Sequence, residues 1–70
     1  MQPLVECHSG YAYAERPIAF YWEGNRLEIE RILVEWRAPR GKGFRVLTND
    51  SILFDLFYDL DEDEWEISKK

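Results

Sequence analysis

Turn-forming residues interrupt this 70-residue chain about every ten positions, and this spacing constrains the fold more than any other feature. The expected turns lie at residues 9–10, 23–25, 38–43, 48–51 and 59–63. Several short apolar segments between such turns are typical of an all-β meander. We therefore expect an all-β fold, either a single small antiparallel sheet or an SH3-like, partly open barrel of about five strands.

In most of these segments the apolar residues recur at every second position, as they do when side chains point alternately to the two faces of a strand. Residues 17–23, 44–48, 51–59 and 64–68 show this period most clearly. The period predicts which side chains face the core. The predicted core residues are Ile18, Phe20, Trp22, Leu27, Ile29, Ile32, Val34, Trp36, Phe44, Val46, Ile52, Phe54, Leu56, Trp65 and Ile67.

Residues 25–37 fit two structures, and local rules favour the helix slightly. Four apolar residues fall at helical spacing: Ile29, Ile32, Leu33 and Trp36. Asn25 is placed to cap such a helix, with Glu28 three residues later as a capping box requires. As a strand, the same segment changes phase at Glu30 and Arg31, which a β-bulge explains. An α+β fold with a helix here is therefore the alternative to the all-β fold.

The chain contains one cysteine, Cys7, and one histidine, His8. One cysteine excludes an internal disulfide framework, and a zinc site needs four ligands. Because Cys7 and His8 are adjacent, they point to opposite faces of a strand and make a poor catalytic pair. The longest apolar stretch, residues 18–22, is far shorter than the ~20 residues of a membrane helix, and the start of the chain lacks the features of a signal peptide. We expect a cytoplasmic protein that is not an enzyme and uses no cofactor or metal.

The length and the turn positions predict how the chain is divided. Seventy residues hold one small domain. We expect residues 1–14 to form an N-terminal segment with room for a short edge strand, and residues 15–68 to form a single β domain.

Charge is distributed unevenly. The formal net charge is −5, yet residues 1–47 contain seven Lys or Arg and six Asp or Glu, whereas residues 48–70 contain two and eight. Four cations and two aromatic residues are close together in the sequence: Trp36, Arg37, Arg40, Lys42, Phe44 and Arg45. A basic loop beside aromatic rings can follow a phosphate backbone and stack on bases. Single-stranded nucleic-acid binding through residues 36–45 is therefore the alternative function.

The aromatic content points first to protein contacts. Eleven aromatic residues (three Trp, four Tyr and four Phe) are more than so small a core needs. We expect Tyr11, Tyr13 and Tyr21 to reach the surface, where exposed rings mark partner sites. The edge strands of a small open sheet also pair readily with a second copy. The sequence thus favours a non-enzymatic binding or accessory module with an unidentified protein partner, present as a monomer or a weak homodimer.

Five motifs follow one another along residues 15–67. They read E-R-P-I-A-F-Y-W-E-G-N (15–25), I-x-x-I-L-x-x-W-R (29–37), F-R-V-L-T-x-D (44–50), L-x-Y-D (56–59) and a late Trp65. In this order they resemble a family of short prokaryotic proteins catalogued only as a domain of unknown function. A similar module forms the tail of some polymerase-like mutagenesis subunits. The resemblance implies a small, mostly antiparallel β fold and no particular activity. The chain departs from the family pattern in residues 38–43, where the family often carries extra aromatic residues and glycine.

Overall fold

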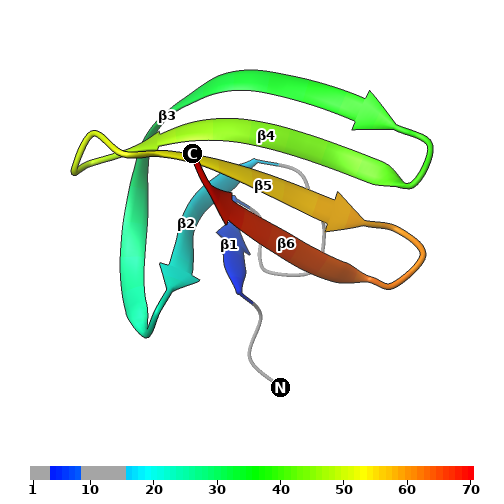
Figure 1. The fold of residues 1–70 in the computed structure, drawn as a ribbon, viewed down its shortest axis with the longest axis horizontal. Coiled ribbons are helices and arrows are strands. Elements are labelled where there is room, and N and C mark those ends of the chain that lie inside the picture. Colours follow the sequence, from blue (N-terminus) through cyan, green and yellow to red (C-terminus); the bar gives the residue numbers. More distant parts are fainter. Residues whose placement is uncertain (1–3, 9–15) are drawn as a thin grey trace.

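The structure, a computed structural model, describes residues 4–8 and 16–70, and this part of the chain is all-β (Figure 1). The strands are β1 (Val5–Cys7), β2 (Pro17–Trp22), β3 (Asn25–Ala38), β4 (Gly41–Thr48), β5 (Leu53–Asp59) and β6 (Glu64–Lys69). Each strand pairs antiparallel with the next, so the sheet order is β1-β2-β3-β4-β5-β6, and the sheet curls into a half-barrel. The all-β prediction is confirmed with six strands, and the helical alternative for residues 25–37 is wrong, because they are strand throughout.

Strand β3 belongs to both halves of the curled sheet. Its residues 25–28 pair with β2, whereas residues 29–38 pair with β4. The register to β4 shifts twice, and the residues skipped are Glu30 and Leu33, so the strand carries two β-bulges. The predicted change of phase at Glu30 is confirmed. A bulge bends a strand and increases its twist, which allows β3 to turn from one half of the sheet into the other.

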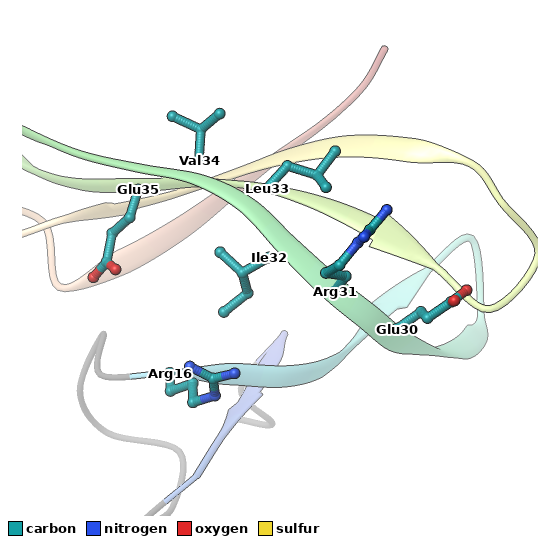
Figure 2. A pocket seen from close by; sticks show the side chains of 7 residues that line it. All are labelled: Arg16, Glu30, Arg31, Ile32, Leu33, Val34 and Glu35. Atoms are coloured by element: carbon teal, nitrogen blue, oxygen red, sulfur yellow. The ribbon is translucent and has the colours of Figure 1, made fainter.

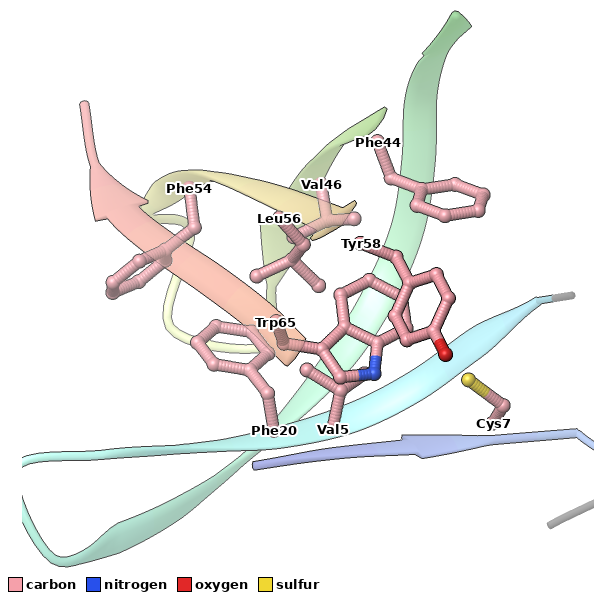
Figure 3. Close-up of a cluster of buried hydrophobic side chains, with 9 residues drawn as sticks. All are labelled: Val5, Cys7, Phe20, Phe44, Val46, Phe54, Leu56, Tyr58 and Trp65. Atoms are coloured by element: carbon pink, nitrogen blue, oxygen red, sulfur yellow. The ribbon is translucent and has the colours of Figure 1, made fainter. Parts of the chain in front are cut away.

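The hydrophobic core fills the concave side of the half-barrel (Figure 3). Its buried members are Val5, Cys7, Phe20, Phe44, Val46, Phe54, Leu56, Tyr58 and Trp65. Rings from the two halves meet directly, since Phe54 of β5 lies edge-on to Phe20 and Trp22 of β2, with centroids 4.9 and 5.2 Å away. Edge-to-face pairs at this separation are worth about 0.5–1.5 kcal/mol beyond the area they bury. These contacts hold the first half of the sheet against the second.

Two residues predicted to be in the core are exposed, and a bulge explains each error. Ile18 is 42% exposed because β1 pairs with Pro17 and Ala19 and skips the residue between them. Val34 is 46% exposed because the bulge at Leu33 reverses the phase of the strand after Ile32. Figure 2 shows the result, with Ile32 on one side of β3 and with Leu33 and Val34 on the other.

Trp36, also predicted to be in the core, lies half-buried on the outer face of the sheet. It faces Gly43 across the ladder, and Gly43 in turn faces Phe57. A Cβ atom on Gly43 would lie 2.2 Å from the indole of Trp36, so the ring covers the glycine closely. A Cβ atom on Gly41 would lie 1.8 Å from the backbone oxygen of Tyr58. Both glycines of β4 therefore leave space that their neighbours occupy.

We expect an added methyl group to lower the stability of the fold by different amounts at the two glycines. We expect Gly43→Ala to destabilise the fold by about 1–3 kcal/mol, the usual range for overpacking. The cost should fall in a Trp36→Ala background, where the indole is absent. Gly41→Ala should cost more than Gly43→Ala, since the obstacle is backbone. Urea unfolding of the four variants measures this, and equal costs of Gly43→Ala in both backgrounds would contradict the packing described.

Candidate interaction surface

Six apolar side chains lie together on the outer face of the second half of the sheet, and we call them the outer apolar face. They come from three adjacent strands and are Leu33, Val34, Trp36, Leu47, Leu53 and Phe57. Leu33, Val34 and Leu53 are exposed, and the other three are half-buried. Exposed apolar side chains gathered on one face of a small domain mark a place where another molecule binds.

An ion pair lies in the middle of the outer apolar face. Arg45 and Asp55 face each other across β4 and β5, and two hydrogen bonds join them, Nε to Oδ1 at 2.8 Å and Nη2 to Oδ2 at 3.1 Å. Lys70 Nζ lies 3.4 Å from the same carboxylate. The hydrogen bonds from Arg45 hold the pKa of Asp55 below its ordinary value. Arg45, predicted to contact nucleic acid, is therefore already bound to a carboxylate.

A second predicted cation, Arg40, is bound to Asp59 at the turn between β5 and β6. The Asp59 side chain is fully buried and accepts hydrogen bonds from Arg40 and from the amides of Asp61 (2.9 Å) and Glu62 (3.2 Å). Burial raises the pKa of Asp59, but the bonds from the Glu62 amide, Arg40 and the Asp61 amide outweigh it, so the pKa is lowered. Asp59 thus organises the turn and anchors Arg40.

The other members of the predicted nucleic-acid site do not form one surface. Phe44 is fully buried, and Lys42 lies 5.3 Å from the centroid of its ring and 2.8 Å from Glu35. Trp36 and Arg37 are consecutive residues of a regular stretch of strand, so they point to opposite faces. Within the described part of the chain Arg37 has no carboxylate partner, and it faces Lys42 across the ladder. The structure brings Arg37 and Lys42 together but separates them from Trp36.

Of the tyrosines predicted to mark an interaction surface, Tyr11 and Tyr13 lie outside the described residues. Tyr21 is half-buried, and its hydroxyl donates a hydrogen bond to Glu6 Oε2 at 3.2 Å. Arg26 binds both oxygens of Glu6 at 2.9 Å, and this bond holds the pKa of Glu6 below its ordinary value. Tyr21 therefore belongs to a polar network on the first half of the sheet, away from the outer apolar face.

The feature that sequence reasoning missed is the open edge of β3. Because β2 pairs only with residues 25–28, no strand among the described residues pairs with the other edge of residues 29–38. The two bulges interrupt the first part of this edge, while residues 34–38 keep a regular register. An open hollow of about 370 Å³ adjoins it, lined by Arg16 and residues 30–35 (Figure 2). The mismatch between a 14-residue strand and its six-residue neighbour is the signal that reveals such an edge.

The direction of the amide groups along this edge follows from the ladder. The amide of Leu60 donates to the carbonyl of Arg40 at 2.7 Å, so Arg40 faces β5 and the next residue, Gly41, faces β3. Gly41 pairs with Ala38, and hydrogen-bonded pairs alternate along an antiparallel ladder. Trp36 and Ala38 therefore turn their amides towards β4, whereas Glu35 and Arg37 turn theirs to the open edge.

The remaining described edges are less suited to pairing. Strand β1 has only three residues, and β6 carries three charged residues among six. Short edge strands and edge charges both discourage a further strand from adding. Residues 34–38 of β3 are therefore the edge segment that is both regular and flanked by apolar side chains.

Comparison with known proteins adds no family. No model of a protein family matches this chain, and no curated protein or solved structure matches it either. The resemblance to the family of unknown function therefore stays a prediction. Over residues 4–8 and 16–70, no helix is long and apolar enough to cross a membrane.

The buried carboxylate of Asp59 predicts an acid-dependent loss of stability. Because its pKa is lowered in the folded state, the unfolded chain takes up the proton first. The contribution of the ionised group is complete above about pH 4 and is lost as the pH falls through the folded-state pKa. We expect Asp59→Asn to be less stable than the wild type at neutral pH, by a difference that shrinks on acidification.

Urea unfolding between pH 7 and pH 2 measures this difference. Asp61→Asn removes one charge from the same turn at an exposed side chain and is the matched control. We expect it to cost less stability than Asp59→Asn at neutral pH. A cost of Asp59→Asn that is the same at every pH would contradict the role assigned to the carboxylate.

Proposed function

We propose that this protein is a non-enzymatic protein-interaction module that binds an extended polypeptide segment along the open edge of β3. The observation that carries the proposal is the regular run of residues 34–38, which among the described strands is paired on one side only and which borders the outer apolar face. Addition of a strand to a sheet edge is a recurring mode of peptide recognition, in which main-chain hydrogen bonds give affinity and alternate side chains give specificity.

The side chains beside the edge suit this mode of binding. A segment added to β3 would place every second side chain on the outer face, next to Val34 and Trp36, and the others next to Glu35 and Arg37. The amides of Glu35 and Arg37 supply the main-chain donors. The expected ligand is therefore a segment of alternating apolar and charged residues.

The proposal includes the cytoplasm as the place of action. The support is that Cys7, the one cysteine of the sequence, lies buried in the core (Figure 3). A chain with one cysteine cannot form an internal disulfide, and proteins without disulfides are typical of reducing compartments.

Single-stranded nucleic-acid binding through residues 36–45 is the second proposal, and it is the weaker one. Arg37 supports this second proposal, because it is exposed and has no carboxylate partner among the described residues. Against it, Arg40, Lys42 and Arg45 are each bound to a carboxylate. A phosphate backbone would have to displace these carboxylates before it could bind the three cations.

Strand addition predicts that binding depends on the outward amide of Arg37. Peptides selected from a random library against the wild-type protein should shift the NMR amide signals of Glu35 and Arg37 most. Arg37→Pro removes the outward donor and should weaken these peptides about tenfold or more, as expected for loss of a main-chain hydrogen bond in a partly buried interface.

Lys69→Pro is the matched control for this substitution. The amide of Lys70 donates to Leu53 (2.9 Å), so the amide of Lys69 points outward from β6 in the same way. Isothermal titration calorimetry should find no loss of peptide affinity in Lys69→Pro. Equal affinities in wild type and Arg37→Pro, or shifts centred on another strand, would overturn the proposal.

The nucleic-acid proposal is tested separately with a fluorescent single-stranded oligonucleotide at low salt. We expect fluorescence anisotropy to show no saturable binding. Saturable binding that weakens steeply with salt and is lost in Arg37→Ala would favour nucleic acid instead.

A further inference from the structure

We propose that the segment bound by β3 is β3 of a second copy of this chain, in an antiparallel pair with its two-fold axis at Trp36. This inference rests on the proposed function, because it names the partner of the same edge. The pair joins the second half of the sheet in one protomer to that of the other, so that the ladder continues across the axis.

The charges beside Trp36 are arranged for this register. An axis at Trp36 places Glu35 opposite Arg37 of the second copy and Arg37 opposite Glu35 of the second copy. Opposite charges that face each other across a ladder stabilise the pair, and like charges destabilise it. An axis at Glu35 or at Arg37 would bring like charges together. An axis at Val34 would set Arg37 against Arg31 and would run across the bulge at Leu33.

Within one chain, the residue that faces Arg37 across the ladder is a cation, whereas a carboxylate at that position would stabilise it. Its neighbour across the ladder is Lys42, and no carboxylate pairs with it among the described residues. Glu35 binds Lys42 through Oε2 at 2.8 Å, yet its side chain is 50% exposed. A carboxylate has two acceptor oxygens and can bind a second cation. Glu35 of the second copy therefore supplies the anion that Arg37 lacks.

The backbone supports the same register. The amides of Glu35 and Arg37 point to the open edge, and the axis at Trp36 makes these two residues the hydrogen-bonded pairs of the new ladder. Each such pair exchanges two main-chain hydrogen bonds. The residues that are complementary in charge are thus the residues whose backbone amides point to the open edge.

Apolar side chains complete the contact on the outer face. Trp36 meets Trp36 of the second copy, and Val34 meets Ala38 of the second copy. The two outer apolar faces then adjoin each other and cover part of the exposed apolar surface. Only five residues of each strand are regular, so the interface is small, and we expect a weak dimer that forms with increasing concentration.

Charge reversal tests the arrangement. Glu35→Arg places arginine opposite arginine at both pairs, and Arg37→Glu places glutamate opposite glutamate. Each single variant should dimerise at least tenfold more weakly than the wild type in sedimentation velocity experiments. An equimolar mixture of the two variants has opposite charges at both pairs and should form a heterodimer about as strongly as the wild type forms a homodimer.

The mixture contains the same two variants, so a heterodimer that forms in it shows that both variants are folded. Far-ultraviolet circular dichroism checks the fold of each variant separately. A wild type that stays monomeric at millimolar concentration would overturn the inference, and so would a mixture that associates no better than its components. If the wild type is monomeric while library peptides still bind the edge in an Arg37-dependent way, only the second copy is excluded. If neither a second copy nor a peptide binds there, the proposed function fails as well.

Discussion

One strand has to serve two halves of the sheet, and the rest of the structure follows from that constraint. Strand β3 pairs first with β2 and then with β4, and it bends at two bulges to do so. The bend brings Phe20 and Trp22 of the first half onto Phe54 of the second, which closes the core. The same change of partner leaves residues 29–38 without a neighbour from the described strands on their other edge. Closure of the core and exposure of the edge have one cause.

The period of two in the sequence predicted most of the strands and most of the core, because burial on one face of a sheet imposes that period directly. It failed where a bulge resets the phase. The bulge at Glu30 left a visible break in the pattern, but the bulge at Leu33 lies within a run of three apolar residues, where no phase can be read. The bulge beside Ile18 lies in β2 opposite β1, a strand pairing that the local pattern does not show.

The candidate site was harder to predict than the fold, because it depends on register. The cations of residues 37–45 are close in sequence, but their neighbours across the ladder decide what they can bind. Asp55 and Asp59, ten and nineteen residues away from Arg45 and Arg40, bind these two cations. Trp36 was predicted to be in the core because it has the same phase as Ile32 and Val34. The bulge at Leu33 instead places it on the outer face, where the glycine opposite it provides the space it fills.

We propose that this protein meets a second polypeptide along the open edge of β3. Residue-resolved amide hydrogen exchange over a dilution series tests whether this edge becomes covered. The amides of Glu35 and Arg37 should exchange rapidly in dilute solution and become protected as the concentration rises, while those of Trp36 and Ala38 stay protected throughout. Protection of the Glu35 and Arg37 amides that does not change with concentration would show that the edge is already covered within one chain and would contradict pairing with a second polypeptide.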